Sequence, residues 1–170
     1  MAEQNFIDPN KITKTVNVQA AQDVAWRVFT EKMAAWWPLA NYKIGSAKAV
    51  DAVIEPRIGG RWFERGEDGS TCQWGSVIAW EPPSRLVLTW DVSADWKYDP
   101  SLNTQIEIRF IAEGKGQTRV ELEHRHLERY GVRREEMRRI YDTEGDWGRL
   151  LQAFAAVAAS QEGSQENGTH

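Results

Sequence analysis

Apolar residues along this chain recur with two different periods, and the changes between them divide the chain into elements. Residues 11–18 alternate β-branched apolar side chains with polar ones, as expected of a strand with one buried face. Residues 21–37 repeat apolar side chains at helical spacing and stop at Pro38, because proline ends a helix. The pattern predicts one strand followed by one or two short helices.

The segment from 47 to 124 has the regularly spaced turn residues of an antiparallel meander. Each apolar run ends in turn residues before the next begins, at 66–70, 81–84 and 113–117, and this spacing predicts six further strands. The link 93–103 is too long for a tight turn, so we expect a loop at the rim of the sheet.

The last two predicted strands separate their residues most clearly into two faces. One face carries Ile106, Ile108, Phe110, Val120, Leu122 and His124. The other carries Glu107, Arg109, Arg119, Glu121, Glu123 and Arg125. We expect the first face to meet the core and the second to face solvent, with ion pairs between neighbouring strands.

A C-terminal helix is predicted over 143–160, with Thr143 and Asp146 as an N-terminal capping pair. Its apolar residues recur at i, i+3, i+4 and i+7, and they are Trp147, Leu150, Leu151, Phe154, Val157 and Ala158. This face requires a hydrophobic sheet to cover it. The expected organisation is a single domain over residues 11–159, with flexible termini at 1–10 and 161–170.

Composition narrows the classes of function. The mass of 19.5 kDa fits one domain, and the net charge of −4 gives no general attraction to nucleic acid or anionic membranes. Cys72 is the single cysteine, which excludes an internal disulfide and argues against structural zinc. No apolar stretch approaches the ~18 residues of a membrane span, and the N-terminus does not resemble a signal peptide. We therefore expect a cytoplasmic protein.

The order of these elements, together with several motifs, resembles the START-like, SRPBCC helix-grip superfamily. The similarity is to the branch named for the activator of the heat-shock-protein-90 ATPase. The stretches that carry it are 24–30 with Trp36-Trp37-Pro38, then 55–64, 74–90, 118–124 and 147–154. The resemblance implies an α+β helix-grip fold, in which a curved antiparallel sheet of about seven strands wraps around a long C-terminal helix.

Members of this superfamily bind lipids, sterols, hormones and polyketides, and some are cyclases or co-chaperones, so the resemblance implies several functions. A chaperone partner is the less expected one, because the eukaryotic activator resembles this chain only in its C-terminal half.

The chain has nine tryptophans in 170 residues, and their density predicts an aromatic cavity between sheet and helix. The candidate cavity residues are Trp36, Trp37, Trp62, Glu64, Trp74, Trp90, Phe110, His124, Trp147 and Leu151. About half of the aromatic residues should be ordinary core. An indole N–H would orient the ligand. Simple alternation puts Trp62 opposite Phe63, and Trp74 opposite Val77, but does not say which face is inside.

Two residues could carry acid or base chemistry. His124 ends a strand on the apolar face, although a core histidine satisfied by its neighbours is the more common situation. Glu64, with Glu55 nearby, could have a raised pKa inside a cavity, or could pair with adjacent arginines as a surface ion.

We expect no catalytic residue, no metal and no cofactor. Gly59 and Gly60 should permit a bend or bulge, and Cys72 should be a small packed residue.

Three functions follow from these features. The first is a module that binds a small apolar or aromatic molecule, reached through the loops 36–44 and 93–103. The second is an enzyme of cyclase or hydrolase type that uses His124 or Glu64. The third is a protein-binding factor like the chaperone activator, which would need an exposed apolar patch. A homodimer is possible without specific support.

Overall fold

The structure, a computed structural model, describes residues 8–142 and 146–167. Its seven strands form one antiparallel sheet in the order β1-β7-β6-β5-β4-β3-β2. The strands are β1 (Lys11–Val18), β2 (Ala49–Ile54), β3 (Arg61–Gly66), β4 (Thr71–Glu81), β5 (Arg85–Trp90), β6 (Thr104–Gly114) and β7 (Gln117–Arg125). The predicted strand after residue 10 and the six-stranded meander are confirmed.

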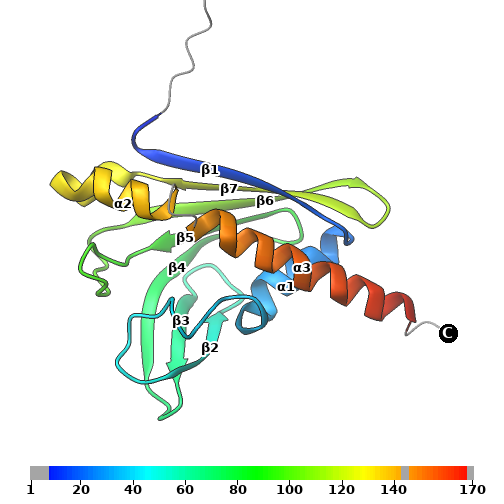
Figure 1. The fold of residues 1–170 in the computed structure, drawn as a ribbon, viewed down its shortest axis with the longest axis horizontal. Helices are drawn as coiled ribbons and strands as arrows, with labels where there is room; N and C mark the ends of the chain where they lie inside the picture. Colours follow the sequence, from blue (N-terminus) through cyan, green and yellow to red (C-terminus); the bar gives the residue numbers. More distant parts are fainter. Residues whose placement is uncertain (1–7, 143–145, 168–170) are drawn as a thin grey trace, which may run out of the picture.

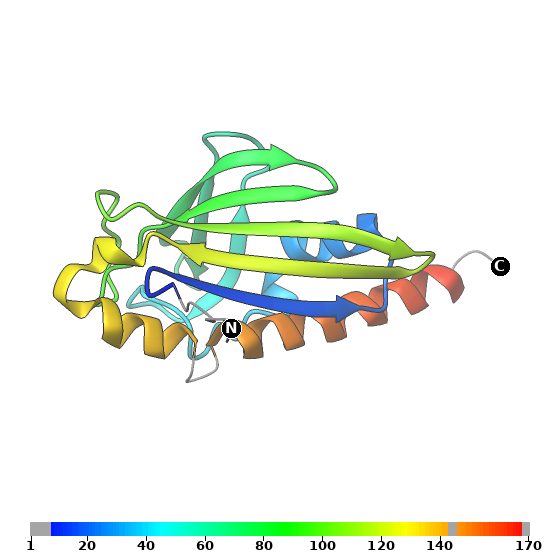
Figure 2. The same ribbon diagram turned by 90° about the horizontal axis from the view of Figure 1, so that it is seen from above.

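Helices close one side of the curled sheet (Figure 1). They are α1 (Gln22–Glu31), the 3-10 helices η1 (Met33–Ala35) and η2 (Leu127–Arg133), α2 (Arg134–Tyr141) and the long α3 (Asp146–Asn167). Helix α3 runs beside β1 and crosses α1 (Figure 2). The predicted α+β helix-grip fold is confirmed. Helix α3 continues to Asn167, beyond the predicted end at 160, whereas Thr143 of the expected capping pair lies outside the described residues.

The two faces of β6 and β7 follow the alternation of the sequence. Ile106, Ile108 and Leu122 belong to the core, and Glu107 lies on the opposite face. There Glu107 is bound by Arg85 and Arg125, each at 2.6 Å, and by Arg109 at 3.0 Å. The cross-strand ion pairs expected on this face are therefore present, although their arginine side chains leave Glu107 only 6% exposed.

A β-bulge changes the alternation along β4. Trp62 pairs with Gly75, while the next residue of β3, Phe63, pairs with Gln73, so Trp74 is an extra residue in its strand. Trp74 and Val77 consequently both lie in the core, and the prediction of opposite faces for them is wrong. Trp62 and Phe63 do lie on opposite faces. Trp62 is in the core cluster, whereas the Phe63 ring lies beneath the Arg61 guanidinium, 4.6 Å from its carbon to the ring centroid.

Gly75 permits this bulge to pack against β5. A Cβ atom at this position would lie 1.8 Å from the carbonyl oxygen of Thr89, a distance at which no side chain fits. The backbone of β4 therefore approaches β5 more closely than any other residue would allow. The bulge directs Trp74 toward the interior of the sheet.

Candidate functional site

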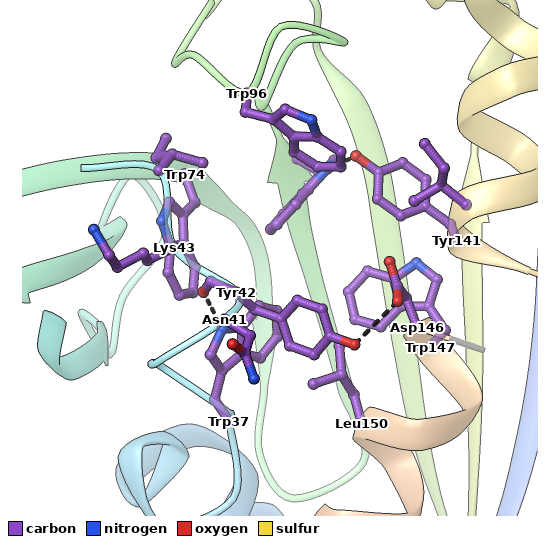
Figure 3. Close-up of a pocket in the computed structure, with 13 residues that line it drawn as sticks. Trp37, Asn41, Tyr42, Lys43, Trp74, Trp96, Tyr141, Asp146, Trp147 and Leu150 are labelled. Carbon is purple, nitrogen blue, oxygen red and sulfur yellow. Dashed lines mark hydrogen bonds between the residues drawn. The ribbon is translucent and has the colours of Figure 1, made fainter. Parts of the chain in front are cut away.

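A cavity of about 400 Å³ opens among the ends of β4 and β5, helix α2, the start of α3 and the loop that follows η1 (Figure 3). Its aromatic wall is formed by Trp37, Trp74, Trp90, Tyr141 and Trp147. Trp96, from the loop between β5 and β6, lies at its edge. The side chains come from six separate segments, so only the folded chain brings them together.

The rings of the wall pack closely against one another. Trp37 lies 4.9 Å from Trp74 and 6.2 Å from Trp147 between ring centroids, and Trp90 lies 6.1 Å from both Trp74 and Trp147. Tilted and edge-to-face contacts at these distances are favourable for aromatic rings. The wall is thus a preformed apolar surface rather than a set of independent side chains.

Four indoles of the wall use their N–H groups internally. The bonds are Trp37 Nε1–H to the Tyr42 carbonyl (2.8 Å), Trp74 Nε1–H to Glu64 Oε1 (2.9 Å), Trp90 Nε1–H to Tyr141 Oη (3.0 Å), and Trp147 Nε1–H to His124 Nδ1 (3.1 Å). A buried N–H without an acceptor is costly, so each finds one within the protein. These indoles therefore offer carbon surface to a ligand, and the expectation that their N–H groups orient it is not met.

Glu64 lies behind the wall and positions it. Its carboxylate, only 2% exposed, accepts the Trp74 indole N–H and also the backbone N–H of Ile44 at 2.6 Å. The first bond holds a wall ring and the second holds the loop after η1 against β3. Glu64 does not line the cavity, so its role in this geometry is support.

His124 is also behind the wall, fully buried on β7. Nδ1 accepts from Trp147, so the neutral ring carries its proton on Nε2 and donates to Thr104 Oγ1 at 3.0 Å. Thr104 in turn donates to the carbonyl of Trp90 at 2.6 Å. Burial lowers the pKa of His124 to about 3. The imidazole is therefore neutral, fully satisfied and without access to the cavity.

A second chain of hydrogen bonds supports the side of the wall formed by α2. Trp90 donates to Tyr141, Tyr141 donates to Tyr130 at 3.2 Å, and Tyr130 donates to the carbonyl of Val92 at 2.8 Å. Burial raises the pKa of Tyr141 to about 12 and raises that of Tyr130 as well. Both phenols consequently remain protonated and add no charge to the cavity.

Polar groups of the cavity gather on one side. Tyr42 donates its hydroxyl to Asp146 Oδ1 at 3.1 Å, joining the loop after η1 to the first turn of α3 (Figure 3). Asn41 and Lys43 flank Tyr42 in the lining. Burial raises the pKa of Tyr42, and the charge and hydrogen bond of Asp146 raise it further. An apolar wall with one polar edge can hold a ring system that carries oxygen atoms along one side.

The candidate residues from the sequence fall into three groups. Those that line the cavity are Trp37, Trp74, Trp90 and Trp147. Those in the core, away from the lining, are Trp36, Trp62, Phe110 and Leu151. Glu64 and His124 lie behind the wall. Leu150, rather than its neighbour Leu151, faces the cavity, because helical rotation turns consecutive residues in different directions.

Several lining residues were not among the candidates. Tyr141 lies in a segment to which the sequence analysis gives no role at the cavity, and Asp146 was assigned only to capping. Tyr42 lies in a loop that the sequence places at the entrance, as does Trp96. The order of elements could identify those two loops, but no periodicity identifies which loop side chain points inward.

Other kinds of site are not evident in the described chain. Among residues 8–142 and 146–167, no group of three or more His, Cys, Asp or Glu side chains is arranged to hold a metal ion. Within the same ranges, no helix is both long and apolar enough to cross a bilayer. Cys72 is a free, half-buried thiol, and burial raises its pKa.

The curled seven-stranded sheet, closed by a long C-terminal helix with a cavity between them, is the helix-grip architecture of the SRPBCC superfamily, a fold of ligand-binding proteins. Residues 19–159 match the model of the family described as "Activator of Hsp90 ATPase homolog 1-like protein". The chain belongs to this family, and the resemblance inferred from the sequence is confirmed. The family name by itself assigns no chaperone partner to this chain.

Among the solved structures with the same fold, two are also similar to this chain in sequence. An anthrahydroquino-gamma-pyrone synthase, Txn09, is 32% identical with a TM-score of 0.62, and the match covers 89% of this chain and 99% of that one. The self-sacrificing resistance protein CalC from Micromonospora echinospora is 28% identical with a TM-score of 0.66, covering 90% and 96%. The protein NE0264 from Nitrosomonas europaea, at 16% identity and a TM-score of 0.63 over 93% and 99%, shares the fold alone. No curated protein matches the chain.

Proposed function

We propose that this protein binds a small, planar, mainly apolar aromatic molecule in the cavity between the sheet and the C-terminal helix. The observation that carries the proposal is the aromatic wall with its indole N–H groups already satisfied. Such a wall presents ring faces and edges and demands no hydrogen bond from the ligand. Flat aromatic molecules gain the most from contact with it.

The size and polarity of the cavity support the same class of ligand. Its volume of about 400 Å³ lies within the range of small-molecule sites. The polar edge at Tyr42 and Asp146 suits a ligand with hydroxyl or carbonyl groups along one side. Similarity to a synthase of an anthrahydroquino-gamma-pyrone, whose name denotes fused oxygenated rings, adds weight to this choice.

A panel of compounds tests the proposal. Melting temperature and calorimetric titration would be measured with 1,8-dihydroxyanthraquinone, flavone, a sterol and a fatty acid. We expect the two flat aromatic compounds to bind and to raise the melting temperature, because a ligand that binds only the folded state stabilises it. If none of the four compounds binds or shifts the melting temperature, the proposal is wrong.

A variant that fills the cavity makes the test specific to this site. Ile140 lines the cavity and is only partly buried, so Ile140→Trp should occupy the space with little damage to the core. Ile78→Trp is the matched control, because Ile78 is 41% exposed on β4 and is not part of the lining. We expect the first variant to lose binding and the second to keep it. Equal binding by both would place the ligand elsewhere.

A second candidate function is acid–base chemistry on the bound molecule. The hydroxyl of Tyr42 lies in the lining with Asp146 as its hydrogen-bond acceptor, and the similarity to a synthase makes a reaction a reasonable alternative. In that reaction Tyr42 Oη would accept a proton from a ligand hydroxyl while its own proton passes to Asp146, so the pair would act as a general base. Because His124 and Glu64 do not line the cavity, this role falls to Tyr42. Mass analysis of incubated ligands, with wild type and Tyr42→Phe, distinguishes turnover from binding.

A further inference from the structure

Trp96 differs from the tryptophans of the aromatic wall in exposure. It is 43% exposed, whereas Trp37, Trp74, Trp90 and Trp147 are all nearly buried. Its indole N–H has no acceptor within the described residues, so the ring is held by contacts alone. One of these is an edge-to-face contact with Tyr141, at 6.3 Å and 87°. Core packing therefore does not account for a tryptophan at this position.

The backbone of Trp96 is also unusual. Its φ angle is +61°, in the left-handed region that glycine and asparagine adopt readily and that a bulky residue adopts only at a cost. A residue of this kind persists where the surrounding structure imposes the conformation, and such residues cluster at ligand sites.

The loop around Trp96 imposes this conformation through several bonds. Ser93 Oγ accepts the backbone N–H groups of Asp95 and Lys97, each at 3.3 Å, and Ser93 N–H donates to the carbonyl of Lys97 at 2.8 Å. Asp95 forms an ion pair with Arg133 of η2 at 2.8 Å. The residues on both sides of Trp96 are therefore fixed.

Asp91 anchors the loop at its base. The Asp91 side chain is 4% exposed, and it accepts the Asn103 N–H at 2.9 Å and the Thr89 hydroxyl at 2.8 Å. The Asp91 carbonyl accepts the N–H of Asp99 at 2.7 Å. These bonds hold the start and end of the loop together, so the position of Trp96 at the cavity edge is built into the fold.

The result is a ring at the mouth of the cavity. Figure 3 shows Trp96 at one edge of the cavity and the Tyr42–Asp146 pair at another, with the aromatic wall between and behind them. A flat molecule bound on the wall would meet the indole as its outer cover. Because the indole is not hydrogen-bonded, it can adjust to the thickness of the bound rings.

We propose that Trp96 is the gripping residue of the site: the loop 93–103 holds its backbone in a strained conformation so that the indole stacks on the bound aromatic ligand. This proposal rests on the proposed function of the cavity. It identifies the loop between β5 and β6 as the part of the chain that sets affinity for flat ligands.

The test uses the full chain and 1,8-dihydroxyanthraquinone as the probe. Dissociation constants and melting temperatures would be compared for wild type, Trp96→Asn and Trp96→Phe. Tyr98→Ala is the matched control, since Tyr98 lies in the same loop, is 37% exposed and does not line the cavity. Asparagine tolerates the left-handed backbone and removes the ring, whereas phenylalanine keeps a ring.

We expect Trp96→Asn to weaken binding about tenfold or more, with a melting temperature close to that of the free wild type. Trp96→Phe should restore most of the affinity, and Tyr98→Ala should bind as wild type does. Wild-type affinity in Trp96→Asn would overturn the gripping role and leave ligand binding intact. A large fall in melting temperature in both Trp96 variants would show that the ring serves the packing of the fold. That result would also overturn the gripping role. If wild type binds none of the four panel compounds, the proposed function itself fails, and this inference with it.

Discussion

Trp147 donates its indole N–H to Nδ1 of His124 across 3.1 Å, behind the wall of the cavity. The bond joins the first turn of α3 to β7 and fixes the tautomer of a histidine that has no contact with water. Because His124 also donates to Thr104, a single buried imidazole orients a wall ring and links two strands. Of the two interpretations that the sequence leaves open for His124, this geometry fits the core histidine satisfied by its neighbours.

Removing the imidazole should destabilise the fold. In His124→Phe, the Trp147 N–H loses its acceptor and Thr104 loses its donor, and unsatisfied buried groups cost about 1–3 kcal/mol each. We expect the free energy of unfolding to fall by about 2–4 kcal/mol, measured by urea denaturation at pH 7. His124→Gln, which retains a donor and an acceptor, should lose less. If His124→Phe and His124→Gln lost the same free energy of unfolding, the shape of the side chain, and not its hydrogen bonds, would matter at this site.

Acid should weaken the fold through the same residue. Folding lowers the pKa of His124 from 6.5 to about 3. Between these two pH values, His124 is therefore protonated in the unfolded chain and neutral in the folded chain. Stability is therefore complete above pH 6.5 and is lost progressively as pH falls toward 3. Between pH 6.5, where the unfolded imidazole is half protonated, and pH 5 we expect a loss of about 1.6 kcal/mol, because the slope approaches 1.36 kcal/mol per pH unit only below the unfolded pKa. Urea denaturation across this range provides the measurement, and a flat profile in wild type would contradict the expectation.

The variant His124→Gln is the control for that profile. It carries no titrating group at position 124, so its stability should change much less between pH 6.5 and 5. The carboxylates whose pKa values are lowered by hydrogen bonds, such as Glu107, lose their contribution only at more acidic pH. The two effects are therefore separable by the pH at which they begin.

Gly75 should tolerate no side chain. In Gly75→Ala, the new Cβ would meet the Thr89 carbonyl at 1.8 Å, so the bulge that positions Trp74 must shift. We expect a loss of about 3 kcal/mol or more, seen in chemical denaturation. Gly148→Ala is the matched control: nothing lies within 4 Å of its Cβ position in α3, and alanine should stabilise a helix there by about 0.5–1 kcal/mol. A neutral effect at Gly75 would contradict the close approach of the strands.

Glu107 should matter more than other acidic residues of the same sheet face. Burial opposes its ionisation, but hydrogen bonds from Arg85 and Arg125 outweigh that effect and hold the pKa of its carboxyl below the ordinary value. Glu107→Gln leaves three arginines without their shared partner, and we expect a loss of about 1–3 kcal/mol. Glu113→Gln, which removes one exposed pair with Arg119, should cost about 0.5 kcal/mol or less. Equal effects in thermal or urea unfolding would rule out a special role for the buried carboxylate.

Regular periods made much of the fold predictable. The alternation on β6 and β7 predicts which residues meet the core, because successive side chains of a strand point to opposite faces. The same rule failed for Trp74 and Val77, because a bulge adds one residue to β4 and shifts the faces beyond it. A bulge depends on how two strands pair, and Gly75 marks its position in the sequence only once the neighbouring strand is known.

The cavity was less predictable than the fold. Four of the predicted tryptophans line it, but Trp36 and Trp62 do not, although all six look alike in the sequence. Trp36 donates to the Val28 carbonyl and Trp62 to the sulfur of Met33, and both are enclosed in the core. Which rings border empty space depends on how α1, α3 and the sheet pack together.

The sequence by itself determined the order of elements, the antiparallel meander, the amphipathic closing helix and the family, because these depend on local periodicity and on motifs along the chain. The tertiary structure alone decided which rings form the cavity, that His124 and Glu64 support it from behind, and that Tyr42, Trp96 and Asp146 border it. The physical reason is that hydrogen-bond partners and empty volume are properties of segments far apart in the chain. Neither exists until those segments are packed against one another.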